Sequence, residues 1–224
     1  MADKSKHTQT PQEVRIAISD TAAIGGSLNM LENPKGIVLF AHGSGSSRFS
    51  PRNRYVAAQL NSAGLATILI DLLTKQEEAI DLRTGRLRFD IPLLASRVTV
   101  AINWLLDNKL SGRLPIGYFG SSTGAAAALV AAAQFGDKIS AVVSRGGRPD
   151  LACDQLPALS APTLLIVGQN DPVVIEMNAG AAKHLRAENK LVIIPGATHL
   201  FEEPGTLEVV AQEAAQWFLQ HLTH

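Results

Sequence analysis

Residues 115–135, PIGYFGSSTGAAAALVAAAQF, contain the pattern that decides the fold. An apolar segment typical of a buried strand (115–120) leads directly into a Gly-x-Ser-x-Gly turn, and an alanine-rich helix is expected over 123–135. Small residues beside the turn allow the strand and the helix to approach closely. We therefore expect Ser122 to stand exposed at a tight, strained turn, although a Gly/Ser-rich turn without function fits the same five residues.

The sequence on both sides of this stretch alternates between apolar strands and helices. Further buried strands are expected at 36–43, 66–72, 140–147, 162–171 and 191–199, and helices near 52–64, 92–107, 176–187 and 206–222. Such alternation predicts an α/β fold with right-handed crossovers, a mostly parallel twisted sheet and helices on both of its faces. Residues 13–19 and 24–31 alternate in polarity around Asp20 and predict an antiparallel hairpin of edge strands.

Length and composition narrow the class of protein. The 224 residues suit one domain, which we expect over 12–224 after a disordered tail at 1–11. Twenty basic residues balance twenty acidic ones, so neither nucleic acid nor an anionic membrane is an expected partner. No apolar stretch is long enough to span a membrane, and the polar start lacks a secretory signal, which predicts a cytoplasmic protein. Cys153, the single cysteine, is expected to be an incidental thiol.

Two further residues follow strands that come after the Ser122 turn. Asp171 ends the run LLIVGQND, and His199 follows LVIIPGAT. A serine hydroxyl needs a base within hydrogen-bond reach, and the base needs an orienting carboxylate. Asn170-Asp171-Pro172 could also be a simple turn, and His199 a structural histidine near the last helix. Taken together with the serine turn, the order Ser, Asp, His predicts a catalytic triad at the carboxyl ends of the strands.

Acyl transfer also requires donors for the negative charge that develops on the substrate oxygen. We expect one from the main-chain N–H of Thr123, directly after Ser122, and the other from Ser44 in the loop His42-Gly43-Ser44-Gly45. His42 is expected to shape that loop and not to act as the base.

Four motifs together resemble the α/β-hydrolase superfamily, and within it small enzymes similar to dienelactone hydrolase that have no lid. The motifs are HGSGSS (42–47), GSSTG (120–124), GQNDPVV (168–174) and GATHLF (196–201). The resemblance implies an α/β-hydrolase fold over 14–222, and the short 147–162 segment leaves no room for a cap domain. One departure is Ser122, since dienelactone hydrolases usually carry cysteine there, and it favours general ester hydrolysis. The run SSRFSPRNRYVA (46–57) resembles a hallmark of a poorly characterised subgroup.

The predicted activity is hydrolysis of small carboxylic esters through an acyl-enzyme. It needs no cofactor and no metal. The expected partner is a small-molecule ester, and a homodimer is left open. A thioesterase, a dienelactone-type lactonase or an organophosphate hydrolase would use the same triad, and a non-catalytic ligand sensor with this fold is the alternative from another class. Arginines crowd the loops at the predicted active edge, and we expect Arg48 or Arg145 to bind an anionic group of the substrate. The alternative is that these arginines form ion pairs with neighbouring carboxylates, namely Asp81, Asp90, Asp150, Glu77 and Glu78.

Overall fold

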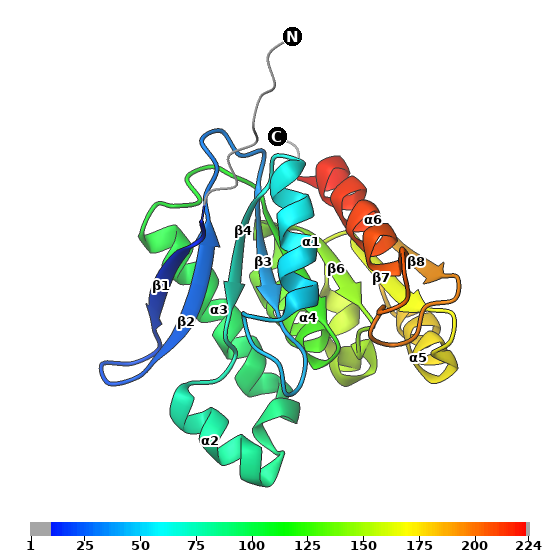
Figure 1. The fold of residues 1–224 in the computed structure, drawn as a ribbon, viewed down its shortest axis with the longest axis horizontal. Coiled ribbons are helices and arrows are strands. Elements are labelled where there is room, and N and C mark those ends of the chain that lie inside the picture. The colour runs from blue at the N-terminus through cyan, green and yellow to red at the C-terminus, as the bar shows by residue number, and fades with distance from the viewer. Residues whose placement is uncertain (1–9, 223–224) are drawn as a thin grey trace.

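One eight-stranded sheet organises residues 10–222, the part of the chain that the structure, a computed structural model, describes (Figure 1). The strand order is β1-β2-β4-β3-β5-β6-β7-β8. Strands β1, β2 and β4 pair antiparallel, and every later pair is parallel, as the sequence predicted. The strands are β1 (Gln12–Ala17), β2 (Ala23–Asn29), β3 (Ile37–Ala41), β4 (Ala66–Ile70), β5 (Ile116–Ser121), β6 (Ile139–Arg145), β7 (Thr163–Gly168) and β8 (Asn189–Ile194).

Helices cover both faces of this sheet, so each face buries its own apolar core. Helices α1 (Pro51–Ser62) and α6 (Thr206–His221) lie side by side on the face toward the viewer in Figure 1. Helices α3 (Ile91–Asp107) and α4 (Thr123–Phe135) cover the other face. Strands β3, β4 and β5 are buried at every position because helices cover both of their faces. The remaining helices are α2 (Lys75–Thr84), α5 (Pro172–Ala182) and the 3-10 helices η1 (Leu87–Phe89), η2 (Gly136–Lys138) and η3 (Pro149–Ala158).

Two predicted elements differ from those observed. Strand β2 is not an edge strand, because it pairs with β1 on one side and β4 on the other. Helix α5 begins at Pro172 and not near 176, since Asp171 occupies the N-cap position and proline suits the first helical turn. Of the predicted N-terminal tail, residues 1–9 lie outside the described residues, and β1 begins at Gln12.

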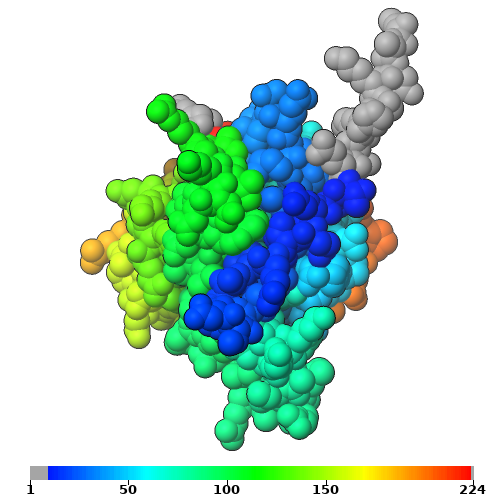
Figure 2. Space-filling view, turned by 90° about the vertical axis from the view of Figure 1, so that its left-hand side faces the viewer, coloured from blue at the N-terminus to red at the C-terminus, as the bar shows by residue number. Residues whose placement is uncertain are grey.

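The segment after β4 holds an element that the sequence analysis missed. Helix α2 and η1 project beyond the carboxyl ends of the strands, at the bottom of Figure 1 and of Figure 2. Helix α2 begins with a capping box between Thr74 and Glu77, and it ends at Gly85, which adopts the left-handed conformation. An ion pair between Asp81 and Arg88 (2.7 Å) holds η1 against α2. In residues 10–222, no helix combines the length and the apolar character needed to cross a membrane.

Candidate active site

Ser122 occupies the sharp junction between β5 and α4. Its backbone has φ 52° and ψ −123°, a conformation that a non-glycine residue seldom adopts. The glycines on either side make this turn possible. A Cβ atom at Gly120 would lie 2.3 Å from the Cα of Ala125, and one at Gly124 would lie 2.2 Å from the His42 carbonyl oxygen. The turn therefore presents the serine above the sheet, as its motif predicted.

Asp171 and His199 meet at the same edge of the sheet. Asp171 lies between β7 and α5, and His199 lies in the loop between β8 and α6. The distance from His199 Nδ1 to Asp171 Oδ2 is 2.7 Å. With an ionised carboxylate as acceptor, Nδ1 carries the proton and donates it, which leaves a lone pair on Nε2. This is the tautomer that a general base needs.

Hydrogen bonds tie the loop of Asp171 to the loop of His199. The Asn170 main-chain N–H donates to the Ala197 carbonyl and its side-chain amide donates to the Gly196 carbonyl, each at 2.9 Å. The Gly196 N–H donates to Gln169 Oε1, also at 2.9 Å. Three contacts therefore fix the spacing between the two loops, and with it the distance between the carboxylate and the imidazole.

Two further features fix the position of the imidazole. Glu203 accepts hydrogen bonds from the Thr198 hydroxyl (2.6 Å) and N–H (3.1 Å), and these bonds lower the pKa of Glu203. On the other side lies Gly146, with φ 51°, where an added Cβ would stand 3.4 Å from His199 Cε1. A larger residue at this position would press on the ring.

Ser122 and His199 line one open cavity of about 190 Å³, together with Arg52, Arg145 and Leu200. Within residues 10–222 the Ser122 hydroxyl makes no direct hydrogen bond to the His199 ring, a contact that is often long in an unliganded enzyme. The geometry therefore brings the predicted nucleophile and base to one cavity, with Asp171 bonded to the base.

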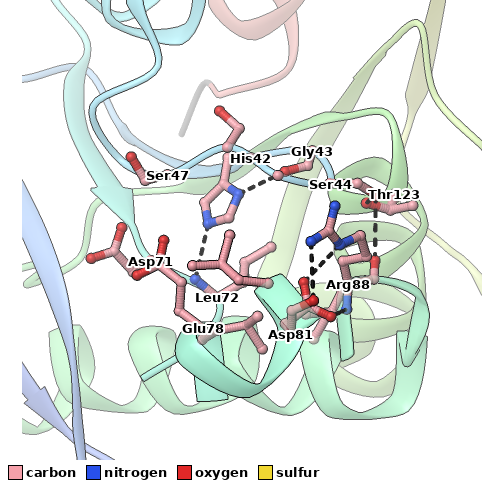
Figure 3. Close-up of a pocket in the computed structure, with 15 residues that line it drawn as sticks. His42, Gly43, Ser44, Ser47, Asp71, Leu72, Glu78, Asp81, Arg88 and Thr123 are labelled. Carbon is pink, nitrogen blue, oxygen red and sulfur yellow. Dashed lines mark hydrogen bonds and ion pairs between the residues drawn. The ribbon is translucent and has the colours of Figure 1, made fainter. Parts of the chain in front are cut away.

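The two predicted oxyanion donors belong to residues that touch. The Ser44 and Thr123 hydroxyls are 3.0 Å apart, and Ser44 Oγ lies 3.5 Å from the Arg88 carbonyl (Figure 3). Throughout the described chain, the main-chain N–H groups of Ser44 and Thr123 have no hydrogen-bond acceptor. Both donors are thus free for a substrate oxygen, and their role stays a prediction.

His42 has both ring nitrogens engaged by the main chain. Its Nε2 accepts from the Leu72 N–H (3.1 Å), and its Nδ1 donates to the Gly43 carbonyl (2.9 Å), as Figure 3 shows. Burial lowers the pKa of His42, so the neutral ring that these bonds require is also the stable one at neutral pH. This fits a histidine that shapes the loop and does not act as a base.

Comparison with known proteins identifies the family. A model of the dienelactone hydrolase family matches residues 24–223. The chain belongs to this family. A crystal structure of dienelactone hydrolase from Anabaena variabilis is 58% identical, covers 96% of this chain and 100% of its own, and superposes with a TM-score of 0.91. Est1E from Butyrivibrio proteoclasticus, 18% identical, shares the fold over 93% of this chain and 98% of its own, with a TM-score of 0.76.

A curated relative carries a different name. The Mycobacterium tuberculosis H37Rv protein called "Putative phosphoribosyl transferase" is 54% identical over 211 residues. The match takes in 94% of this chain and only 46% of that protein. The chain therefore spans about half the length of the curated relative. With these comparisons, the sheet topology and the helices around it establish the α/β-hydrolase fold.

Arg48, one of the two predicted substrate-binding arginines, lies away from this cavity. Its guanidinium pairs with Glu13 (2.9 Å) and with Asp71, and its N–H donates to Asp71 Oδ1 (2.9 Å). Two carboxylates already neutralise it, so the ion-pair alternative describes Arg48 and the substrate-binding prediction is not supported. Neither Glu13 nor Asp71 was among the carboxylates expected to pair with an arginine. Glu13 lies on β1, far from Arg48 in the sequence, so no local pattern in the sequence indicated this pair.

Arg145, the other predicted arginine, lines the cavity together with a second arginine that the sequence analysis had not selected. Arg145 ends β6, is 7% exposed, and donates from Nη2 to Asn53 Oδ1 (3.3 Å). Arg52 lies in the first turn of α1 and donates to Glu202 (2.6 Å). Both Arg52 and Asn53 belong to the run 46–57, which the sequence analysis linked to a subgroup without assigning it any chemistry.

Proposed function

We propose that this chain is a serine hydrolase that cleaves small carboxylic esters through an acyl-enzyme. One observation carries the proposal: His199 is bonded to Asp171 at 2.7 Å, and its ring lines the same cavity as Ser122, which is held at φ 52°. Family membership supports hydrolysis. We infer that the substrate is an ester and that Ser122, His199 and Asp171 carry out the reaction.

The mechanism follows from the roles of the three residues. The Ser122 hydroxyl attacks the ester carbonyl while His199 Nε2 takes its proton, and Asp171 stabilises the imidazolium that forms. The free N–H groups of Ser44 and Thr123 stabilise the oxyanion. His199 then protonates the leaving alcohol. In the second half of the reaction, water attacks the acyl carbonyl while His199 takes its proton, and His199 returns that proton to Ser122 as the acid is released.

The shape of the site favours small esters. The cavity of about 190 Å³ is open, and the segment between β6 and β7 forms only the short η3, which leaves the site uncapped on that side. A thioester, a lactone or a phosphotriester could be attacked by the same serine, so a panel of these substrates ranks the alternatives. A ligand sensor would keep the fold without an activated serine.

Phosphoribosyl transfer is not the activity we propose. The relative named for it is more than twice as long as the region that this chain matches. The family model covers residues 24–223, so the shared region is the hydrolase-like one. The name of the longer protein therefore supplies no activity for this chain.

The decisive experiment is labelling with a fluorophosphonate probe, followed by mass spectrometry of the modified peptide. We expect one modified residue, Ser122, and no label after heat denaturation. Ser122→Ala should abolish both labelling and hydrolysis of p-nitrophenyl acetate, and its circular dichroism should match that of the parent protein. Retained esterase activity in this variant, or an unreactive Ser122 in the parent, would rule out the proposal.

A further inference from the structure

Arg145 is a buried cation that pairs with no carboxylate among residues 10–222. Of its five N–H donors, only one on Nη2 finds an acceptor, the Asn53 side chain at 3.3 Å. Its Nε and Nη1 are buried and have no hydrogen-bond partner among residues 10–222. By contrast, five other arginines of the described chain each pair with a carboxylate within 2.9 Å, namely Arg48, Arg52, Arg88, Arg97 and Arg148.

A guanidinium in this situation keeps its charge without compensation. Burial lowers the pKa of Arg145 to about 10, with a contribution from the nearby Arg52, and the group is still protonated at neutral pH. The Phe201 ring lies 5.8 Å from the guanidinium carbon and adds a weak cation–π contact. A buried charge with free donors is costly unless something else binds it. Arg145 is among the residues that line the cavity of Ser122, so an anion bound in that cavity would lie beside this guanidinium.

Arg52 places a second cation on the same cavity. It comes from α1, whereas Arg145 comes from the end of β6. Its Nη1 donates to the exposed Glu202 at 2.6 Å, and its Nε is buried without a partner among the described residues. Ser46, Ser50 and Ser121 also line this cavity. Ser50 is the N-cap of α1, so the positive end of that helix dipole faces the same space.

We propose that Arg145 and Arg52 bind a phosphate group of the substrate, beside the ester that Ser122 attacks. A planar carboxylate is satisfied by a single guanidinium fork. Two forks from different elements, with hydroxyls and a helix N-terminus around them, suit the three oxygens of a tetrahedral phosphate. The substrate class is then an ester that carries a phosphate. The substrate assignment rests on the proposed function, whereas the anion site itself does not.

Calorimetric titration of Ser122→Ala protein with inorganic phosphate tests the site without any turnover. We expect binding in the millimolar range, and a loss of about tenfold or more when Arg145→Gln or Arg52→Gln is added. Two controls remove the same charge from neighbouring positions outside the cavity: Arg148→Gln, whose side chain pairs with Asp150, and Arg54→Gln on the exposed side of α1. These should change phosphate binding by less than about twofold.

Three outcomes would overturn the proposal. Phosphate could fail to bind at about 20 mM, a concentration well above the dissociation constant expected for two charged guanidinium groups. The control variants could lose as much affinity as Arg145→Gln and Arg52→Gln. Acetate could bind as tightly as phosphate, which would assign the arginines to a carboxylate. Arg52→Gln keeps the test valid if the buried Arg145→Gln fails to fold. Labelling of Ser122 by the fluorophosphonate probe is independent, so the hydrolase and the phosphate site can fail separately.

Discussion

His42 and His199 follow strands at the same edge of one sheet, yet their surroundings differ in a way that favours different roles. His42 is 8% exposed, and main-chain groups occupy both of its nitrogens. The His199 side chain is 40% exposed, and one nitrogen is bonded to Asp171 while the other is left unused. An imidazole with both nitrogens hydrogen-bonded to the main chain is suited to a structural role. A ring with one free nitrogen beside a serine can move a proton.

The same contrast separates the two arginines that the sequence singled out. In the part of the chain that the structure describes, Arg48 has two carboxylate partners and Arg145 has none. At this edge of the sheet, the groups available for chemistry are those whose hydrogen bonds the fold leaves incomplete. Each of the following predictions tests one side of this contrast.

The largest expected effect belongs to His199. We expect His199→Gln to lower kcat for p-nitrophenyl acetate by about 10⁵-fold, because the serine loses its base. His42→Gln should lower it by less than about tenfold, since no proton passes through that ring. Steady-state kinetics on both variants measures the difference. Equal losses would show that the contrast between the two histidines has no functional meaning.

Asp171→Asn should cost nearly as much. An amide in place of the carboxylate no longer selects the Nδ1–H tautomer, and we expect kcat to fall by about 10⁴-fold with an unchanged far-UV spectrum. The matched control is Asp150→Asn, which removes a carboxylate that pairs with Arg148 outside the cavity. That variant should retain kcat within about threefold. A similar loss in both variants would point to a general effect of charge.

Features encoded locally could be predicted from the sequence. The helix over 123–135 was placed to the residue, because a strand, a tight turn and an alanine-rich run follow one another there. The strands from β3 to β8 were found from their apolar runs, and β1 and β2 from their alternating polarity. Helix α2 was missed because its polar sequence, KQEEAIDLRT, has no clear apolar face. Its only local signals were the capping box at Thr74 and the glycine at position 85.

The arginines show why part of the site could not be predicted. Whether an arginine binds substrate depends on which carboxylates lie near it, and these can come from distant parts of the chain. Arg48 is neutralised by Glu13, which lies 35 residues earlier on the first strand. Arg52 lines the cavity, and Asn53 accepts a hydrogen bond from Arg145, because the start of α1 lies beside the end of β6. Local pattern supplies the strand ends where chemistry occurs, and tertiary packing decides which side chains there remain unpaired.

A smaller effect, on stability and its pH dependence, is expected at His42. His42→Gln should lower the free energy of unfolding by about 1–2 kcal/mol at pH 7, because the bond to the Gly43 carbonyl is lost. Burial lowers the pKa of His42 below its ordinary 6.5, so the unfolded chain gains a proton that the folded chain does not. The stability that the neutral His42 gives the parent protein is therefore lost as the pH falls below 6.5, by at most about 1.4 kcal/mol per pH unit. Urea denaturation at pH 7 and pH 5 should show a smaller difference in the free energy of unfolding between the parent protein and His42→Gln at pH 5. An equal difference at both pH values would contradict a buried, neutral His42.

The smallest effect is expected at Arg48. Arg48→Gln removes two ion pairs of a partly exposed side chain, and we expect a loss of about 1 kcal/mol in the free energy of unfolding. Because Arg48 does not line the cavity of Ser122, kcat/KM for a neutral ester and for a carboxylated ester should change by the same factor. The ratio of these two values is the measurement that matters, since a loss of stability alone leaves it unchanged. A selective loss for the carboxylated ester would mean that Arg48 exchanges its carboxylate partners for the substrate, and incomplete hydrogen bonding would then no longer mark the functional arginines.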